Sequence, residues 1–389
     1  MKEQIRRILS RRWKTAALVA IVLFLSFGLY TPVKTVRGLL VDSGLTVVNN
    51  IISVDGNLVA FESTSSTVTI YDIVSGSSTS FSTPGSAYQP IIDGDKVVIN
   101  GNITGLLTPS TIYYCELPHT KPLQPCGPWE VAAQGQGLSF EAFWGFPVAR
   151  GDLIVWPVSG GFSFWRFSTG TTTTITAAST AGWPSTNGEL VAFEAKPASS
   201  PSYDIMYYDT SNPGQGIVNT GLPARQYATS LSQYTIAFDD NTTTPNRIRY
   251  YDILRNQAST GSTGPLGNLT YYGFSGIWGD RIVFSASEKS LGFDCNGDGT
   301  QSSSEQCLQY WNIRAPGYIA TTLAASAAPP TTGSTAIFDK TIIFQGTANH
   351  LQFVTVPMKG DVDQNGIVDA NDQSIVKGCL GQLLKGTVC

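Results

Sequence analysis

The chain has 389 residues, of which 13% are charged, 42% are hydrophobic and 11% are aromatic, and its formal net charge at pH 7 is −4. This length suits one large domain or two ordinary ones, and the abundance of Gly, Ser, Thr and aromatic residues favours an all-β protein with many turns. No basic stripe follows the N-terminus, which excludes nucleic acid as a partner on electrostatic grounds.

The N-terminus joins a basic segment to an apolar one. Residues 1–14 contain six Lys or Arg residues and one acid, and residues 15–30, "TAALVAIVLFLSFGLY", contain no charge. A positive flank before an apolar run is typical of an export signal or membrane anchor. The run is short for a spanning helix, so an uncleaved anchor and a cleaved signal both remain open. Either one predicts that the chain from about residue 34 is extracytoplasmic, membrane-anchored or secreted.

A short pattern then recurs seven times, and each copy is a turn followed by a β-branched run that ends in an aromatic or similar residue. The copies are "DGNLVAF" (55–61), "DGDKVVIN" (93–100), "RGDLIVW" (150–156), "NGELVAF" (187–193), "SQYTIAF" (232–238), "GDRIVF" (279–284) and "DKTIIF" (339–344). Most copies are followed by a strand pattern rich in Tyr and Ile, and then by one rich in Ser and Thr. The sequence therefore predicts three strands per unit.

Such a repeat is the sequence mark of a β-propeller, because one unit cannot bury its apolar faces alone and must stack on its neighbours. The pattern resembles the TolB-like (WD40-like) family of propeller repeats over roughly residues 50–356. The resemblance implies an all-β fold, a seven-bladed β-propeller at 34–358 that follows the N-terminal segment 1–33. A β-sandwich is the alternative, although a sandwich has no reason to repeat one unit. The seventh copy lacks a final strand, and we expect residues 36–48 to supply it.

Four acids mark the one catalytic hypothesis that the sequence offers. We expect Glu62, Glu194, Asp239 and Asp240 at the ends of the innermost strands. A glycosidase needs two carboxylates that face one sugar, and the alternative role is polar lining or turn capping. The two histidines are far apart and lack zinc-binding spacing, and no nucleophile elbow or phosphate loop is present. We therefore assign no catalytic residue.

The segment "DCNGDGTQSSSE", 294–305, matches the twelve-residue calcium loop of EF-hand proteins. Calcium prefers six to eight hard oxygen ligands, which this pattern supplies. The predicted ligands of this first site are Asp294, Asn296, Asp298, the carbonyl of Thr300, Ser302 and the bidentate Glu305. No helical pattern flanks the loop, so we expect a Cys295–Cys307 disulfide to hold it in place of two helices.

A second calcium loop follows at 361–372, "DVDQNGIVDAND". Its predicted ligands are Asp361, Asp363, Asn365, the carbonyl of Ile367, Asp369 and Asp372. Residues 360–381 resemble one repeat of a type I dockerin, which implies a small EF-hand-like calcium module at 359–389. A full dockerin has two repeats and only one is present here, so a calcium-stabilised tail is preferred to docking on a cohesin.

The six cysteines form three local pairs, Cys115 with Cys126, Cys295 with Cys307 and Cys379 with Cys389. Six cysteines allow 15 connectivities, so local pairing is a preference, and six reduced thiols are the alternative. Disulfides persist in oxidising compartments, which agrees with export. Together these features predict an exported, calcium-binding propeller that acts as a cell-surface binding or scaffold module for a protein or glycan. The alternatives are a carbohydrate-active enzyme or accessory subunit, with a glycoside hydrolase as the enzyme class, and a purely structural surface protein.

Overall fold

The fold is that of a computed structural model with two compact units, Met1–Thr35 and Val36–Cys389. The structure describes residues 35–36, 40–48, 52–85, 87–101, 111–118, 123–134, 147–158, 160–177, 180–196, 203–224, 229–240, 247–259, 276–288, 294, 299–301, 306–314, 320–323, 336–339, 341–345 and 349–356. Within these ranges no helix is long and apolar enough to cross a bilayer. The predicted N-terminal helix and the predicted C-terminal calcium module lie outside them.

The second unit contains seven antiparallel sheets, which we number as blades 1 to 7. Blade 1 is β3 (Ile52–Asp55), β4 (Leu58–Thr64), β5 (Thr67–Asp72) and β6 (Ser78–Ser82), and blade 2 is β7 (Ala87–Asp93), β8 (Lys96–Gly101), β9 (Thr111–Glu116) and β10 (Glu130–Gln134). Blade 3 is β11 (Val148–Arg150), β12 (Leu153–Val158), β13 (Gly161–Arg166) and β14 (Thr171–Thr176). Blade 4 is β15 (Thr180–Thr186), β16 (Leu190–Lys196), β17 (Tyr203–Asp209) and β18 (Ile217–Ala224), with the short 3₁₀ helix η1 (Pro213–Gln215) before β18.

The remaining blades repeat this order. Blade 5 is β19 (Thr229–Ser232), β20 (Thr235–Asp240), β21 (Arg247–Asp252) and β22 (Gln257–Ala258), and blade 6 is β23 (Gly276–Trp278), β24 (Arg281–Ser287), β25 (Gln306–Asn312) and β26 (Ala320–Leu323), beyond which lies β1 (Thr35–Val36). Blade 7 is β27 (Ala336–Phe338), β28 (Thr341–Gln345), β29 (His350–Thr355) and β2 (Leu40–Thr46). The seven predicted copies thus correspond to seven blades, each with four strands and, in blade 6, β1 as a fifth at the edge.

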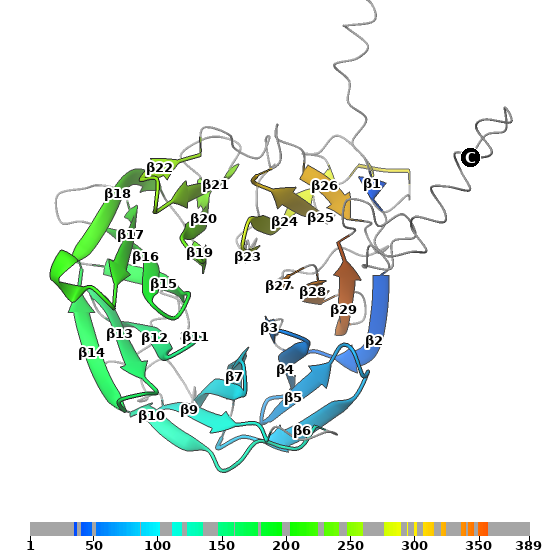
Figure 1. The fold of residues 1–389 in the computed structure, drawn as a ribbon. Helices are drawn as coiled ribbons and strands as arrows, with labels where there is room; N and C mark the ends of the chain where they lie inside the picture. The colour runs from blue at the N-terminus through cyan, green and yellow to red at the C-terminus, as the bar shows by residue number, and fades with distance from the viewer. Residues whose placement is uncertain are drawn as a thin grey trace, which may run out of the picture. The chain divides into compact units, whose positions relative to one another are not determined.

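Apolar clusters between neighbouring blades close the ring. Each of seven clusters combines buried residues of two successive blades, and the last combines blades 7 and 1. In β4, Val59 and Phe61 pack toward blade 7, whereas Ala60 packs toward blade 2. Since successive side chains of a strand point to opposite faces, both faces of every sheet are buried. This explains why the second strands read as continuous apolar runs, and Figure 1 shows the sheets in chain order around a common centre.

The strand β2, near the N-terminal end of this unit, completes blade 7, as predicted for residues 36–48. β2 pairs antiparallel with β29, and Leu40 lies opposite Val354. The carboxylate of Asp42 lies 3.3 Å from Nδ1 of His350 and accepts a 3.2 Å hydrogen bond from Nε2 of Gln352. In Figure 1 the blue β2 lies beside the orange β29. Strands from the two ends of the propeller therefore share one sheet.

The prediction of three strands per unit is wrong in one respect. Each blade has an additional innermost strand that precedes the turn, such as β3 before Gly56 and β11 before Gly151. β11 has only three residues, which is too short for a period of two to be recognised in the sequence. The predicted runs are thus the second strands of their blades.

Candidate functional site

The two ends of the propeller differ in their connections. At one end, which we call the turn end, two- or three-residue turns join the first and second strands of the blades. At the opposite loop end, connections join the second and third strands and link successive blades. The longest of these, 135–147, 259–275 and 288–305, all belong to the loop end. A ligand that needs loop contacts would therefore meet the loop end.

Side chains of the first strands tie neighbouring blades together at the turn end. Oδ2 of Asp55 accepts a hydrogen bond of 2.8 Å from the backbone N–H of Gly94 in blade 2. Oγ of Ser232 in blade 5 likewise accepts from Gly279 in blade 6 at 2.8 Å. Because such bonds join a side chain of one blade to the backbone of the next, they fix the spacing of the innermost strands.

Arg150 connects five blades at this end. From blade 3 its Nη1 lies 2.9 Å from Oδ1 of Asp55 in blade 1, and its Nε lies 3.3 Å from Oδ1 of Asp93 in blade 2. Its guanidinium also lies 4.7 Å from the ring centroid of Trp278 in blade 6 and 5.9 Å from that of Phe338 in blade 7. Burial raises the pKa of Asp93, against the opposing effect of Arg150. Because this one side chain contacts blades on both sides of the ring, Arg150 spans the central axis of the propeller.

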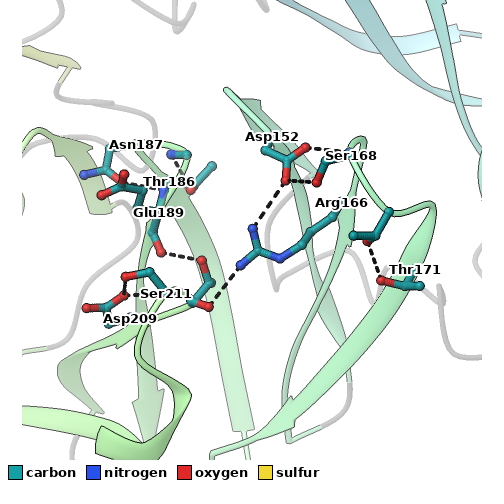
Figure 2. A network of polar contacts seen from close by, with 12 residues as sticks. Asp152, Arg166, Ser168, Thr171, Thr186, Asn187, Glu189, Asp209 and Ser211 are labelled. Carbon is teal, nitrogen blue, oxygen red and sulfur yellow. Dashed lines mark hydrogen bonds and ion pairs between the residues drawn. The ribbon is translucent and has the colours of Figure 1, made fainter.

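A second arginine links blades 3 and 4 farther along the sheets (Figure 2). Arg166 lies between Asp152 of its own blade, 3.4 Å away, and the backbone carbonyl of Thr210 in blade 4, to which it donates at 3.0 Å. Asp152 also accepts from the N–H and the hydroxyl of Ser168, at 2.7 and 2.6 Å. The turn end is thus held by side-chain contacts between blades near the axis and farther out.

At the loop end, the residue after each apolar run occupies an equivalent position in its blade. These residues are Glu62, Asn100, Pro157, Glu194, Asp239, Ser285 and Gln345. By strand alternation each of them except Ser285, whose side chain is not described, lies on the side of its sheet that faces the next blade. Five of the seven are acids or amides, so a polar position recurs in an otherwise apolar strand.

Two of these residues join one blade to the backbone of the next. Oε1 of the buried Glu62 accepts a hydrogen bond of 2.6 Å from the backbone N–H of Gln89. Nε2 of Gln345 donates to the carbonyl of Val47, at 3.2 Å, where the chain enters blade 1. The fully buried Asn100 makes no side-chain hydrogen bond within the described part of the chain. The loop end therefore contains side chains that link neighbouring blades and also a buried amide, that of Asn100, without a hydrogen bond in the described structure.

Asp239 and Asp240 lie in different environments although they are adjacent. Burial raises the pKa of Asp239 to about 7, and its Oδ1 is shut off from solvent without a hydrogen bond in the described structure. Asp240 forms an ion pair of 3.1 Å with Nη1 of Arg249. The two adjacent side chains therefore differ in kind, one shut off without a hydrogen bond on Oδ1 and the other paired with an arginine.

The structure places the four candidate acids in second strands, not at the ends of the innermost strands as predicted. Glu62 lies on the blade 2 side of β4, Glu194 on the blade 5 side of β16, and Asp239 on the blade 6 side of β20. These three carboxylates belong to three separate interfaces between blades. By the same alternation Asp240 lies on the blade 4 side of β20, in the interface that Glu194 also faces. Two of the four acids therefore share one interface between blades, where Asp240 is paired with Arg249, and the arrangement matches the alternative role of polar lining.

Of the first predicted calcium site, only Asp294 and Thr300 are described, together with Gly299 between them. The backbone N–H of Gly299 donates a 2.6 Å hydrogen bond to Oδ2 of Asp294, and Gly299 has a φ of +88°. The other ligands of this site, and all ligands of the second site, lie outside the described residues. No metal-binding group of three or more His, Cys, Asp or Glu residues occurs within the described ranges.

The structure joins Cys115 and Cys126 in a disulfide with a Cα–Cα distance of 5.7 Å. This disulfide closes the connection between β9 and β10 at the turn end, where the N–H of Gly127 donates to the carbonyl of Glu116 at 3.0 Å. Cys307 is also disulfide-bonded, and its predicted partner Cys295 lies outside the described residues, as does the predicted pair of Cys379 and Cys389.

Sequence reasoning missed Asn100 and Gln345 at the loop end and Arg150 at the turn end. The first two could have been found by comparing the residue that follows each apolar run. No sequence signal marks Arg150, because its partners come from four other copies of the repeat.

No protein-family model matches the sequence, and no curated protein matches it. Solved structures match the fold. The β-propeller domain of the trilobed protease from Pyrococcus furiosus matches with a TM-score of 0.53 and 12% identity, covering 80% of this chain and 95% of that one. A chain of the mitotic checkpoint complex matches with a TM-score of 0.52 and 12% identity, covering 83% and 95%. The sheet topology and these matches confirm the predicted fold, a β-propeller of seven blades.

Proposed function

We propose that this protein is an exported binding or scaffold module whose loop end holds a protein partner. The observation that carries the proposal is the difference between the two ends. At the turn end, tight turns join the first and second strands, Arg150 connects five blades, and the Cys115–Cys126 disulfide closes the longer connection 117–129. The longer connections 259–275 and 288–305 belong to the loop end. Binding residues are commonly carried on loops that a rigid scaffold positions.

A protein is the preferred partner for two reasons. One structurally similar chain belongs to a complex of proteins, the mitotic checkpoint complex. The competing glycosidase function is less well supported, since Glu62 and Asp239 lie in separate interfaces between blades. Asp240 shares an interface with Glu194 but is paired with Arg249. A cell-surface glycan remains the other class of ligand that a binding assay can reveal.

We further propose that calcium binds the loop 294–305, which joins β24 to β25 at the loop end. The described residues fit this role. The backbone N–H of Gly299 donates a hydrogen bond to the carboxylate of Asp294, and Gly299 has a positive φ. Together these two features form the sharp turn that a calcium loop requires. The carboxylate of Asp294 and the carbonyl of Thr300 would be ligands. Calcium would supply a fixed charge that holds this polar connection in one conformation.

An oxidising, extracytoplasmic location supports the same function. The disulfide between Cys115 and Cys126 would be reduced in most cytosols, whereas it persists outside the cytoplasm. The basic and apolar segments at 1–30 are the proposed export signal or anchor.

Affinity capture from host envelope extract, with the full chain as bait, tests the binding site. One variant replaces loop-end residues 260–275, in one of the long connections, with a Gly/Ser sequence of equal length. The matched turn-end variant replaces the exposed Val74 and Leu254, 73% and 72% exposed, with Ser. We expect a protein that the wild type and the turn-end variant retain and the loop-end variant loses. Retention by the loop-end variant, loss by the turn-end variant, or the absence of any retained protein would contradict the proposal.

Calcium titration tests the metal sites separately. We expect calcium to raise the melting temperature of the wild type, since a ligand that binds only the native state stabilises it. Glu305→Gln should abolish the contribution of the first site, and Asp361→Asn that of the second. If EDTA and calcium leave the melting temperature of the wild type equal, the calcium proposal fails while the binding proposal stands.

A further inference from the structure

The outer strand of blade 3 is an unusual sheet edge. β14, "TTTTIT", pairs with β13 along its whole length without a shift in register, from Gly161 opposite Thr176 to Arg166 opposite Thr171. The strand contains no charged residue, no proline and no glycine, and all of its side chains except Ile175 are exposed. It is therefore a regular, neutral strand at the rim of the propeller.

The backbone of β14 offers three residues to an additional strand. In an antiparallel ladder, alternate residues turn both their N–H and their C=O toward the partner strand. The N–H of Ala177 donates to the carbonyl of Gly160 at 2.7 Å, which fixes the alternation. Counting back from Ala177, the residues that direct both groups away from β13 are Thr172, Thr174 and Thr176. Their side chains also share one face of the sheet.

Outer strands usually avoid pairing with other chains by means of bulges, charges, proline, short length or a cover. In blade 1, the indole of Trp129 covers the edge of β6, since its Nε1 donates to the carbonyl of Ser82 at 2.9 Å. β10 has a register shift between Val131 and Ala133, and β18 has one together with Pro223.

The other outer strands have comparable protection. β22 has only two residues, and β2 has a register shift and carries Asp42. β26 has β1 on its outer side. Among the outer strands that the structure describes, β14 lacks all of these devices. An edge left in this state is a template for strand addition.

We propose that β14 pairs antiparallel with β14 of a second copy of this protein, around a two-fold axis that passes through Thr174. This register uses all three outward residues, because it sets Thr174 against Thr174 of the partner and Thr172 against Thr176. Every hydrogen-bonded pair is then Thr with Thr, a favourable cross-strand combination. No charge in the strand meets its own copy, whereas an edge with one charge at this position would repel itself. The two four-stranded blades would form one continuous sheet of eight strands.

Analytical ultracentrifugation of the full chain over a wide concentration range, in detergent, tests this pairing. Thr174→Pro removes only an outward N–H, so the ladder with β13 remains intact. The control is Ser80→Pro in β6. Ser80 is also an exposed outward residue, and its hydroxyl bonds that of Thr69 at 2.8 Å, as Thr174 bonds Ser163 at 2.8 Å. We expect a concentration-dependent dimer for the wild type and Ser80→Pro, and a monomer for Thr174→Pro.

A wild type that stays monomeric, or a Thr174→Pro variant that still dimerises, would overturn the proposal. Thr174→Cys keeps the test decisive if the proline variant fails to fold. Hydrogen-bonded antiparallel neighbours have Cα atoms about 5.5 Å apart, within the range of a disulfide. Thr174→Cys should therefore give a reducible covalent dimer and Ser80→Cys should not. Equal cross-linking of the two variants, or none in either, would refute the two-fold pairing.

Discussion

Replacing Arg150 with Met should destabilise the whole ring, although the change is at one turn. Met keeps much of the aliphatic length of the side chain and removes the charge. The variant loses two ion pairs, at 2.9 Å to Asp55 and 3.3 Å to Asp93, and the contact with the Trp278 ring. Arg150 is 27% exposed. The cost of breaking its ion pairs should therefore lie between about 1 kcal/mol, the upper value for surface pairs, and about 3–5 kcal/mol, the value for buried pairs. We expect a loss of about 3 kcal/mol.

Urea denaturation, followed by tryptophan fluorescence, measures this loss. Arg255→Met is the matched control, because Arg255 is 74% exposed and, among the described residues, pairs with Asp252 of its own turn. The control should cost less than about 0.5 kcal/mol. If Arg150→Met costs no more than Arg255→Met, then Arg150 does not join the blades as described.

The pH dependence of the Arg150→Met variant provides a second check. Burial and Asp55 both raise the pKa of Asp93, and Arg150 opposes them. Without Arg150 the folded-state pKa rises further above the unfolded value. A raised folded-state pKa gives stability that is present at low pH and lost as pH rises through that pKa. The deficit of the variant should therefore shrink as the pH falls toward 4, and a deficit that grows would refute the account.

Three further predictions concern other parts of the propeller. In the wild type, stability should fall as the pH rises toward and through about 7, the folded-state pKa of Asp239, and Asp239→Asn should remove this loss. The variant should therefore gain roughly 2–3 kcal/mol over the wild type between pH 5 and pH 8 in urea titrations. Asp42→Ala should cost about 1 kcal/mol at pH 7 and speed hydrogen exchange in β2, and this cost should fall below pH 4 because hydrogen bonding from Gly44 lowers the pKa of Asp42. Gly161→Ala should lower stability by about 2 kcal/mol or more in thermal melts, because a Cβ there would lie 1.9 Å from the carbonyl oxygen of Ile175.

Much of the fold could be predicted because each second strand is buried on both faces. Such strands give continuous apolar runs that are recognisable without knowledge of their neighbours, as in "LVAF" before Glu62. The innermost strands escaped recognition since they have as few as three residues, as in β11 and β23. The pairing of β2 with β29 could be predicted from the strand missing after the seventh copy.

The sites were less accessible to sequence reasoning. The calcium pattern at 294–305 identifies candidate ligands from local spacing alone, and it stays a prediction. The link between Glu62 and Gln89 depends on which face of β4 meets blade 2, and alternation fixes that face only after the neighbouring strand is known. The contacts of Arg150 join residues up to 188 positions apart, from Arg150 to Phe338, and they exist only once the ring closes.

The sheet shared by β2 and β29 has a mechanical consequence. Leu40, where β2 begins, lies opposite Val354, near the end of β29, so the chain enters and leaves this pair of strands at the same end. A pulling force applied through the two termini would load the hydrogen bonds one pair at a time and peel β2 from β29, as a zipper opens. The same bonds would resist far larger forces in shear. A tether at the N-terminus and a load at the C-terminal tail would thus act on the short β1 at the edge of blade 6 and on β2 in blade 7 before they strained blades 1 to 5.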